Sequence, residues 1–417
     1  MGNASSTIEP EGPWPAGLLT EDLDLPRMRR QRHDRLQRQL ERHGVDALLL
    51  TGSGAVQYAA GPDLAAGDAG RAVQQRTTAL VVAGDPEPHL LTPHPAAAPP
   101  ELAGDHVHPA MYLESAAGAE DAVTRIADLV GGPIGRLATD DLSMPLFQAL
   151  TRRLDGTDLV DAARLLGPAR VVKTPDELRC IRGAQQRNEL AMYDVQRTLR
   201  PGVRQTDLTG TLLQGVFDRG ATANAIDPIW QVMPERRADG PFTTNGDIAF
   251  PLVTTGRRFE EGDIVWVDSG VQFHGYASDF GRTWIVGDRP RPTDRQRGQF
   301  DRWRQVVLAV LDQVRPGASG ADLTAAARRA AGGATPWLSH FYLVHGLGTE
   351  SAEAPMIGTD AGPDADERLT LAPGMVLVIE PVIWDDGAAG YRAEDIVAVT
   401  DDGWVALSDY PYDPYGL

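Results

Sequence analysis

The chain has 417 residues, of which 58 are acidic and 39 basic, and its formal net charge is −19 at neutral pH. This balance argues against a broad basic surface for nucleic acid, and the length fits two domains better than one core. A single cysteine excludes a disulfide framework, and no uninterrupted apolar run reaches the roughly 18 residues that a membrane span needs. We expect a soluble, cytoplasmic protein with neither nucleic-acid nor membrane partners.

The N-terminal part alternates between helical and strand-like patterns. Residues 1–26 are polar and rich in proline and lack the features of a signal peptide, so we predict a flexible arm there. Apolar residues at helical spacing predict an amphipathic helix over 27–43, followed by a strand over 46–51. The apolar runs 79–83 and 89–92 flank Gly-Asp-Pro-Glu-Pro and predict a hairpin. We therefore predict an α/β domain over residues 27–168.

Two histidines, His106 and His108, stand one residue apart in this N-terminal part. A pair of this spacing can bind a metal ion, but without acidic ligands it is more often a surface feature. The sequence alone assigns these histidines no role.

A second domain is predicted over residues 169–417. Its first helix has Thr174 as N-cap, Pro175 at the first position and Glu177 at the third, which is the pattern of a capping box. Further helices are expected from a cap at Thr293 and Gln296 to about residue 314, and over residues 321–331. We expect these helices to cover the outside of a sheet whose inner face carries the site.

Residues of metal-ligand type stand at or near strand-like runs of this domain, namely Asp268, Asp279, His345, Glu380 and Glu394. The run before Asp268 breaks at Ser-Gly and a second strand follows Asp279, so the two carboxylates can face each other across a hairpin. His345 and Glu380 end apolar runs. Glu394 lies in a strand-like run over 391–399, where the alternation of side chains places Arg392 on the same face.

Four carboxylates and one imidazole form an oxygen-rich set that suits Mn, Fe(II), Co or Zn and does not suit a structural thiolate zinc site. Their formal charge would be neutralised by two divalent ions, and burying so many acids without a cation would be very costly. Taken singly, Asp268 and Asp279 are equally typical of turns and Glu394 of a strand surface. Taken together, the five residues indicate a metal site.

Five motifs around these residues resemble those of the M24 metallopeptidase family: Val-Asp-Ser-Gly (267–270), Gly-Tyr-Ala-Ser-Asp-Phe-Gly-Arg-Thr (275–283), His-Gly-Leu-Gly (345–348), Ile-Glu-Pro (379–381) and Tyr-Arg-Ala-Glu-Asp (391–395). Residues 170–182 are similar to the junction at which these enzymes enter the catalytic domain. The resemblance implies an α/β (α+β) fold, with a creatinase-type N-terminal domain followed by a pita-bread domain. In the latter, a curved antiparallel sheet is covered by helices. A homodimer is also implied.

The resemblance also implies the chemistry. Two divalent ions, manganese first and iron, cobalt or zinc as alternatives, would share a water or hydroxide and polarise a substrate carbonyl. By family position, Asp279 and Glu394 would bridge the ions and Asp268 would complete one of them. His345 and Glu380 would complete the other, and Glu380 is also the expected general base.

Three residues are predicted to contact substrate: Arg392, Tyr276 and His340. The guanidinium of Arg392 would bind a substrate carboxylate or steady a bridging ligand, with a pair to Asp395 or another acid as an equal alternative. His340 stands five residues before His345, on the opposite face if the strand is regular, and a structural role for it is the alternative.

Three positions depart from the family pattern, because Pro251, Phe341 and Ala352 stand where histidines are usual. Those histidines contact a peptide carbonyl or move protons in the family's peptidases. The leading hypothesis is hydrolysis of an Xaa-Pro peptide bond. The first alternative is action on a small non-peptide metabolite, by amide hydrolysis or by an elimination like that of dimethylsulfoniopropionate lyase. The second is a non-catalytic binding protein, against which the complete ligand set argues.

Overall fold

A computed structural model describes residues 23–62, 75–240, 254–288 and 290–412. The chain divides into two compact units, one over Leu23–Asp176 and the other beginning at Glu177. Most of the predicted arm lies outside the described residues, but helix α1 (Leu25–His43) already includes the arm's last two residues. Its N-terminus is set by Asp24, whose side chain accepts from the Arg27 N–H. The predicted domain boundary between residues 168 and 169 stays a prediction.

The N-terminal unit contains a six-stranded mixed sheet. Its order is β5 (Val107–Pro109), β4 (His89–Thr92), β3 (Thr78–Val82), β1 (Ala47–Leu50), β7 (Arg136–Thr139) and β8 (Asp158–Asp161). Strands β3 and β4 form the predicted hairpin, with Thr78 opposite Leu91. A separate pair joins β2 (Gln75–Arg76) to β6 (Met111–Tyr112), and η2 (Pro95–Ala97) and η3 (Gly104–His106) are single turns between β4 and β5.

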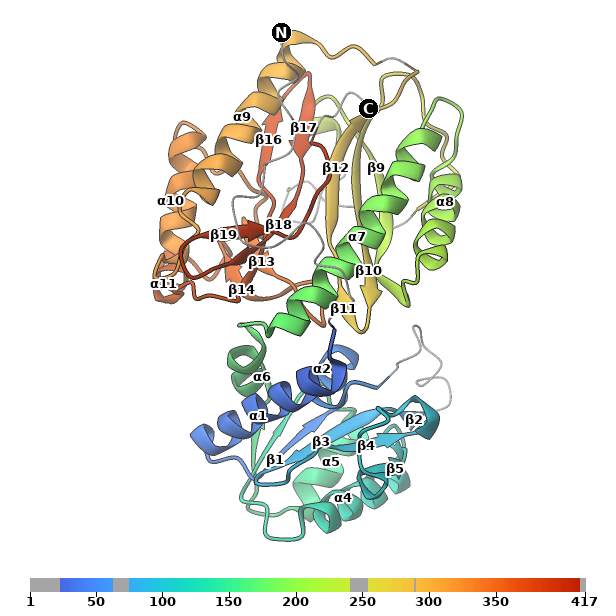
Figure 1. Ribbon diagram of the computed structural model, residues 1–417, viewed down its shortest axis with the longest axis vertical. Helices are drawn as coiled ribbons and strands as arrows, with labels where there is room; N and C mark the ends of the chain where they lie inside the picture. The colour runs from blue at the N-terminus through green and yellow to red at the C-terminus, as the bar shows by residue number, and fades with distance from the viewer. Residues whose placement is uncertain (1–22, 63–74, 241–253, 289, 413–417) are drawn as a thin grey trace. The chain divides into compact units, whose positions relative to one another are not determined.

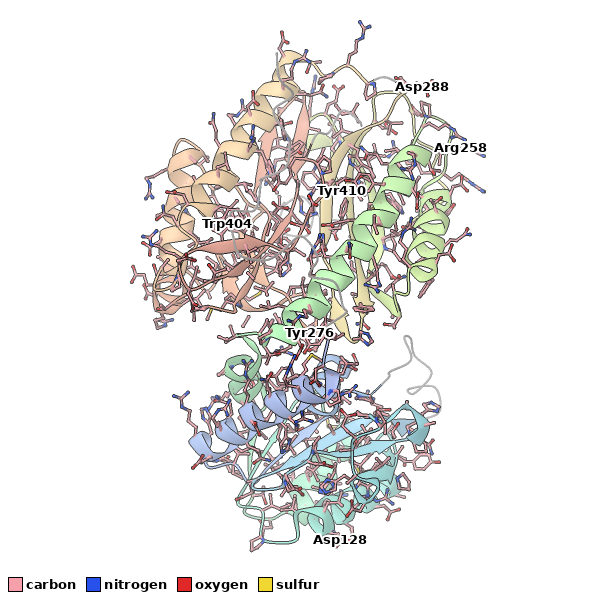
Figure 2. The ribbon with its side chains drawn as sticks, viewed as in Figure 1. Asp128, Arg258, Tyr276, Asp288, Trp404 and Tyr410 are labelled. Carbon is pink, nitrogen blue, oxygen red and sulfur yellow. The ribbon has the colours of Figure 1, made fainter. Side chains whose placement is uncertain are left out.

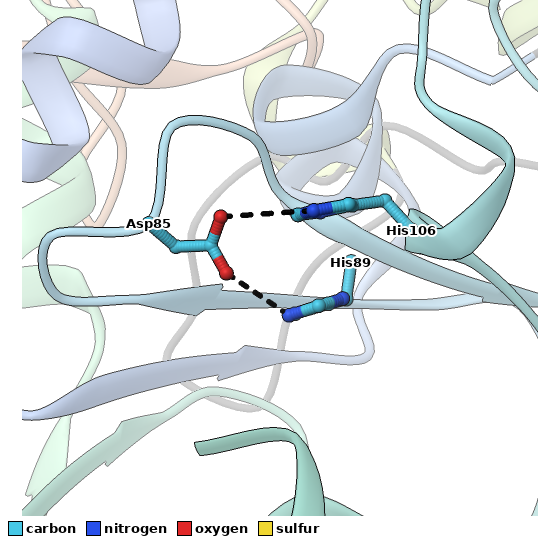
Figure 3. A group of neighbouring side chains, drawn as sticks. All are labelled: Asp85, His89 and His106. Atoms are coloured by element: carbon cyan, nitrogen blue, oxygen red, sulfur yellow. Dashed lines mark ion pairs between the residues drawn. The ribbon is translucent and has the colours of Figure 1, made fainter. Parts of the chain in front are cut away.

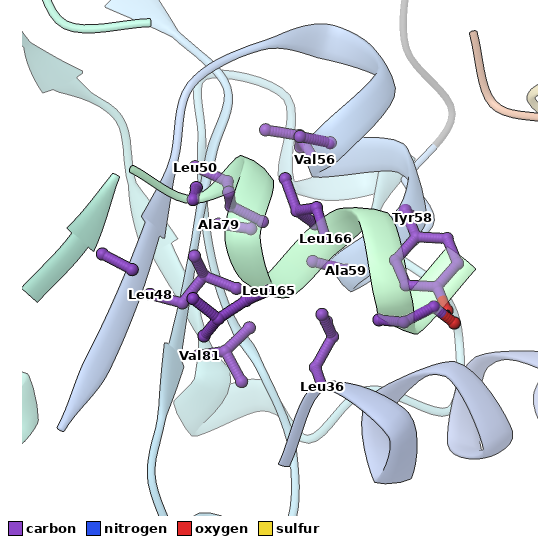
Figure 4. Close-up of a cluster of buried hydrophobic side chains, with 14 of the residues drawn as sticks. Leu36, Leu48, Leu50, Val56, Tyr58, Ala59, Ala79, Val81, Leu165 and Leu166 are labelled. Atoms are coloured by element: carbon purple, nitrogen blue, oxygen red, sulfur yellow. The ribbon is translucent and has the colours of Figure 1, made fainter. Parts of the chain in front are cut away.

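Helices cover both faces of this sheet because its central strand is apolar on both sides (Figure 1). Leu48 and Leu50 of β1 pack into one hydrophobic cluster, and Ala47 and Leu49 pack into another. Figure 4 shows the first cluster, which α1, α2 (Ser53–Ala60) and α6 (Ala163–Arg170) help to form. Helices α4 (Ala116–Val130) and α5 (Met144–Arg153) contribute to the second. The period of two along β1 therefore specifies the three layers.

The C-terminal unit has two halves with the same order of elements, in which two helices precede an antiparallel sheet (Figure 1). The first half comprises α7 (Pro175–Thr198), α8 (Gln205–Asp218), β9 (Ala223–Met233), the turn η4 (Arg237–Asp239), β10 (Ile264–Phe273), β11 (Tyr276–Ala277) and β12 (Phe280–Ile285). The second half begins with α9 (Asp294–Leu311) and α10 (Gly320–Ala330). The sequence shows no internal repeat from which this repeated order of elements could be predicted.

The sheet of the second half has the order β14 (Glu353–Ile357), β13 (Val344–Gly346), β15 (Val376–Ile379), β18 (Asp395–Val399) and β19 (Trp404–Ala406). A separate hairpin joins β16 (Val382–Asp385) to β17 (Ala389–Arg392), and α11 (Pro363–Arg368) connects β14 to β15. Helix α9 begins at the predicted capping box of Thr293 and Gln296. None of the helices in the described part of the chain combines the length and apolar character needed to cross a membrane.

Candidate metal centre

Asp268 and Asp279 are brought together by an antiparallel strand pair, as predicted. Strand β10 pairs with β12 so that Asp268 stands opposite Gly281, and Asp279 lies just before β12 begins. Side chains alternate along β10, and Val265 and Val267 pack in the hydrophobic cluster that includes residues of α7 and α8. Asp268 therefore points to the opposite face of the sheet.

The strand that carries Asp268 does not end at Ser269-Gly270, so this detail of the prediction is wrong. Strand β10 continues to Phe273, and its register with β9 shifts on both sides of Gly270. A Cβ at Gly270 would lie 2.7 Å from the carbonyl oxygen of Ser278, so the close approach of the two chains requires glycine. The Ser-Gly pair is a β-bulge beside a site residue instead of a turn.

His345 and Glu380 come from neighbouring antiparallel strands. His345 of β13 pairs with Val378 of β15, and Glu380 follows β15 directly. The Nδ1 atom of His345 lies 2.9 Å from the carbonyl oxygen of Gly346, which can only accept, so Nδ1 carries the proton. The Nε2 atom then points its lone pair toward Asp279 Oδ2, at 3.2 Å, and Glu380 Oε1, at 3.5 Å. This is the tautomer that a metal ligand needs.

Glu394 lies in a break between two strands, whereas the sequence predicted one strand over residues 391–399. Strand β17 ends at Arg392 and β18 begins at Asp395 in a different sheet. The Glu394 N–H donates to the Gly281 carbonyl at 3.0 Å. A Cβ at Gly281 would lie 2.5 Å from the Glu394 carboxyl carbon. Glycine at position 281 is therefore needed to leave room for this carboxylate.

Arg392 lies among the carboxylates, as predicted, although it and Glu394 do not share one strand. Its Nε and Nη2 atoms donate to Glu380 Oε2 at 3.2 and 2.7 Å. Nη2 also lies 3.1 Å from Asp268 Oδ2 and forms an ion pair with Glu394 Oε1. Asp395, the alternative partner named from the sequence, instead accepts from the hydroxyls of Ser408 and Tyr412. These contacts favour a role for Arg392 in steadying the acidic residues.

Burial dominates the electrostatics of this cluster. It raises the pKa of Glu380 to about 7, against the opposing effect of Arg392. Burial, with a further contribution from Asp268, also raises the pKa of Asp279 well above its usual range. Burial is also the main cause that raises the pKa of Glu394. One guanidinium cannot balance four buried carboxylates, so without another cation the acids must take up protons near neutral pH.

Several ligand atoms of the cluster lack an N–H donor within the described part of the chain. Asp268 Oδ1, Asp279 Oδ1 and Glu394 Oε2 are buried and receive no N–H donor there, and a hydrogen bond between Asp279 and Glu394 requires one of these two carboxylates to carry a proton. One oxygen from each of these three residues lies within 4.8 Å of the other two. Carboxylate oxygens and an imidazole lone pair at such distances repel one another unless a cation or a proton stands between them. The donor set therefore fits divalent ions of the Mn, Fe(II), Co or Zn type.

The other two predicted substrate contacts have different surroundings. Tyr276, labelled in Figure 2, is fully buried, and its hydroxyl donates to Glu177 Oε1 at 2.9 Å. His340 is exposed, has a φ of 55°, and places Nδ1 2.5 Å from Asp360 Oδ2. Strand β13 begins only at residue 344, so the condition of a regular strand from His340 to His345 is not met. Substrate contact by either residue stays a prediction.

Two of the three positions without the usual histidine can be located. Ala352 is exposed just before β14. Phe341 is partly buried and packs against a hydrophobic cluster that includes Trp266 and Val382, so it extends this cluster. Pro251 lies outside the described residues.

Tyr342 lies beside the cluster and was not identified from the sequence. Its ring centroid is 4.8 Å from that of His345, and burial raises its pKa strongly, with further contributions from three carboxylates of the cluster led by Glu380. Its phenol therefore stays protonated at neutral pH and can donate a hydrogen bond. The only signal in the sequence was an aromatic residue three positions before His345, which no strand period would assign to the site.

Comparisons with known proteins agree with this geometry. The family model of metallopeptidase family M24 matches residues 179–401, and that of the creatinase/prolidase N-terminal domain matches residues 32–172. The probable dipeptidase PepE of Mycobacterium tuberculosis is 30% identical over 294 residues, which cover 69% of this chain and 71% of that protein. The Xaa-Pro dipeptidase of Lactobacillus delbrueckii subsp. lactis is 28% identical over 387 residues, covering 89% and 95%.

Among solved structures, dipeptidase PepE from Mycobacterium ulcerans superposes with a TM-score of 0.71 at 25% identity, covering 94% of this chain and 98% of that one. The Xaa-Pro dipeptidase from Bacillus anthracis has a TM-score of 0.72 at 22% identity, covering 93% and 99%. The predicted fold class, a creatinase-type N-terminal domain followed by a pita-bread domain, is confirmed.

Proposed function

The chain belongs to metallopeptidase family M24, and we propose that it hydrolyses the amide bond before proline in Xaa-Pro dipeptides or short peptides at a pair of divalent metal ions. Family membership makes it a metal-dependent hydrolase of the Xaa-Pro peptidase type, as predicted from the motifs. The observation that carries the proposal is the convergence of four buried carboxylates and the Nε2 lone pair of His345. The expected ligands are Asp268, Asp279, His345, Glu380 and Glu394.

Metal ions held there would lower the pKa of a water nucleophile and polarise the scissile carbonyl. Glu380 is the proposed proton carrier, because its carboxylate lies within the proposed metal site while Arg392 fixes one of its oxygens. Its carboxylate takes a proton from the attacking water as the C–O bond forms. The proton then passes to the proline nitrogen as the C–N bond breaks.

Arg392 acts in this proposal as a positioning residue. Its contacts with Asp268, Glu380 and Glu394 leave the guanidinium committed to the carboxylates. Two divalent ions together with this guanidinium exceed the charge of four carboxylates by one unit. The site therefore favours one further anionic group, such as hydroxide or the carboxylate of a substrate.

We assign Tyr342 the part that the absent histidines play in related peptidases. Its protonated phenol lies next to His345 and near the carboxylates. From there it can donate a hydrogen bond to the oxygen of the scissile amide, where negative charge develops during attack. Phe341 stacks on Tyr342 at 4.0 Å and limits the positions that the phenol ring can adopt.

The test is product detection by mass spectrometry after Mn(II)-loaded protein is incubated with Xaa-Pro dipeptides and Xaa-Pro-Yaa tripeptides. Matched Xaa-Ala peptides are the substrate control, and the Glu380→Gln variant is the enzyme control. Cleavage before proline by the wild type alone supports the proposal. A fully metal-loaded protein that leaves the whole panel intact would overturn it.

A second candidate is hydrolysis or elimination on a small non-peptide metabolite at the same metal site. It is favoured by Pro251, Phe341 and Ala352, which lack the imidazoles that contact peptide in the family. Restoring one of them separates the two candidates. If the substrate is a peptide, Ala352→His should raise kcat/KM for Xaa-Pro substrates, whereas for a non-peptide enzyme peptide cleavage should stay at the blank rate.

We also propose a homodimer with manganese as the native metal in the cytoplasm, and a domain boundary near residue 169. The homodimer and the manganese follow from the family resemblance. The cytoplasmic location is consistent with a single, buried cysteine, Cys180. Light scattering on the metal-loaded protein would measure the mass of the assembly. Metal analysis of protein isolated from its natural source would identify the ion.

A further inference from the structure

A second cluster of metal-ligand side chains lies in the N-terminal unit, far in sequence from the catalytic ligands. Figure 3 shows Asp85, His89 and His106 directed toward one another. One ligand atom from each residue lies within 4.8 Å of the other two. Asp85 Oδ2 is 3.2 Å from His89 Nε2, and Asp85 Oδ1 is 3.8 Å from His106 Nε2. The two imidazole rings stack at 4.4 Å with an interplanar angle of 7°.

The backbone around Asp85 is held independently of its carboxylate. Gly84 has a φ of 80°, which suits glycine, and its N–H donates to Gln37 Oε1 at 2.9 Å. The carbonyl oxygen of Asp85 accepts from Gln37 Nε2 at 3.0 Å and lies 2.8 Å from His33 Nε2. Helix α1 thus fixes the turn between β3 and β4, and the Asp85 carboxylate remains directed at the imidazoles.

Two features of His89 indicate a ligand position. Its side chain is 9% exposed, and its Nε2 atom is directed at Asp85 Oδ2, 3.2 Å away. Its other nitrogen, Nδ1, lies 3.0 Å from His108 Nε2. When Nδ1–H donates to His108, the lone pair of Nε2 points into the cluster. Metal-bound histidines usually have such a partner on the second nitrogen.

The spacing is close to that of ligands around one ion. Zinc binds imidazole nitrogen and carboxylate oxygen at about 2.0–2.2 Å, so two ligands of a tetrahedral site stand roughly 3.3–3.6 Å apart. The two distances from Asp85 fall just below and just above this range, and the stacked imidazole planes must tilt for both lone pairs to meet one ion. The side chains of Asp85 and His106 are 20% and 15% exposed, which gives an ion a route from solvent.

We propose that Asp85, His89 and His106 bind one zinc-type transition-metal ion, with water in the fourth position and His108 orienting His89. Two imidazoles and one carboxylate favour a borderline ion such as Zn²⁺ over the harder Mn²⁺. The ion would join the β3–β4 turn and the adjoining first residue of β4 to η3. This site is independent of the proposed peptidase activity.

The test measures zinc content of the full-length protein by mass spectrometry after loading and dialysis. The variants are His106→Ala, which removes a ligand, and His108→Ala, which removes the orienting partner. His94→Ala is the matched control, because His94 is an exposed histidine of the same unit. His106→Ala should lose one zinc equivalent, His108→Ala should bind zinc about 10–100-fold more weakly, and His94→Ala should match the wild type.

A second measurement distinguishes the loss of zinc binding from a loss of folding. Wild type and His106→Ala should unfold at the same temperature in a chelator, and saturating zinc should raise the midpoint of the N-terminal unit by about 5–10 °C only in the wild type. X-ray absorption spectra at the zinc edge should also show scattering from imidazole ligands, and His106→Ala should reduce it. Equal zinc content in all four proteins, with no difference in the zinc-induced shift, would overturn the proposal. The cluster would then be a hydrogen-bonding network only.

Discussion

The two clusters of metal-ligand side chains in this chain have opposite compositions. The proposed catalytic cluster (Asp268, Asp279, His345, Glu380 and Glu394) buries four carboxylates around one imidazole, whereas the Asp85 cluster (Asp85, His89 and His106) places two histidines beside one carboxylate. Burial raises the pKa of carboxylates such as Glu380 in the first and lowers the pKa of His89 in the second. In both cases burial favours the neutral form. The difference is that a neutral carboxyl must lose a proton before it binds a metal ion, and a neutral imidazole already has its lone pair.

This difference separates the metal ions that each cluster can select. An oxygen-rich set competes well for hard ions, and its negative charge grows as cations replace protons. A nitrogen-rich set gains less from charge and more from the preference of borderline ions for imidazole. A chain with both can hold different ions in its two domains under the same conditions.

The largest expected difference between the two clusters is in catalysis, and it is tested by removing the proposed proton carrier, Glu380. Glu380→Gln keeps the shape of the side chain but removes its basic oxygen, and we expect kcat to fall by about 10²–10⁴-fold. His106→Ala in the other cluster should change kcat by less than about twofold, because nothing in the proposed reaction uses it. Steady-state kinetics on Mn-loaded protein, with the exposed Glu367→Gln as control, measures both. An Asp85-cluster variant as inactive as Glu380→Gln would contradict the separation of roles.

The next effect is the pH dependence of stability in the metal-free protein. The folded pKa of Glu380, about 7, lies above its ordinary value of 4.5, so the native state holds this proton more tightly than the unfolded chain. Its contribution is fully present below pH 4.5 and is lost as pH rises through 7, at a cost on the order of 3 kcal/mol. Asp279 and Glu394 act in the same direction.

We therefore expect the C-terminal unit of the metal-free protein to unfold at lower denaturant concentration at pH 8 than at pH 6. Metal loading should stabilise it more at pH 8, because the ions replace the lost protons. Urea titrations at both pH values, with and without Mn(II), provide the measurement. A metal-free protein whose catalytic unit is equally stable at pH 6 and pH 8 would show that the acids are not protonated in the absence of metal.

A smaller effect concerns Tyr342. Tyr342→Phe removes one hydroxyl while keeping the ring against His345, and we expect kcat/KM for Xaa-Pro substrates to fall about tenfold, as for one lost hydrogen bond. Metal content should not change, which distinguishes substrate contact from ligand support. Tyr112→Phe is the control, since Tyr112 is exposed in the other unit. A loss of manganese in Tyr342→Phe would instead assign the phenol to holding the metal site.

The two clusters also differ in how far the sequence revealed them. The sequence predicts that the five residues proposed as metal ligands come together, because strand ends and a hairpin are local patterns, and the structure does bring them together. The break at Glu394 and the bulge at Gly270 were not predicted, since both arise from contacts with residues distant in sequence: Gly281 leaves room for Glu394, and Gly270 meets the Ser278 carbonyl.

The Asp85 cluster was not predicted at all. The sequence assigns His106 and His108 no role, and it indicates Asp85 only as part of a turn. The parallel pairing of β4 with β5, which sets Leu91 opposite His108, brings the three histidines together. Such pairing leaves no trace in local sequence, and the turn that directs Asp85 depends on Gln37 of a helix more than 40 residues earlier. Long-range register was therefore the missing information.

The smallest predicted effect is the acid dependence of the Asp85 cluster. Burial, His106 and His108 lower the pKa of His89, while Asp85 raises it, with a net decrease from 6.5. A depressed imidazole pKa contributes stability that is present above 6.5 and lost as pH falls through the folded value, which is the reverse of the Glu380 case. Because Asp85 and His106 beside His89 are partly exposed and screened by solvent, the expected loss between pH 7 and pH 5.5 is small, about 1–2 °C in the midpoint of the N-terminal unit.

The loss should appear as a difference between wild type and His89→Gln in chelator, since the variant has no imidazole to protonate at this position. Thermal melts of both proteins at the two pH values isolate it from the other titrating groups, and His94→Gln, altered at an exposed histidine, should follow the wild type. Zinc should deepen the wild-type pH dependence, because protons compete with the ion for the same nitrogen. A wild type no more sensitive to acid than His89→Gln, with or without zinc, would mean that His89 is not held neutral. The contrast between the two clusters would then rest on composition alone.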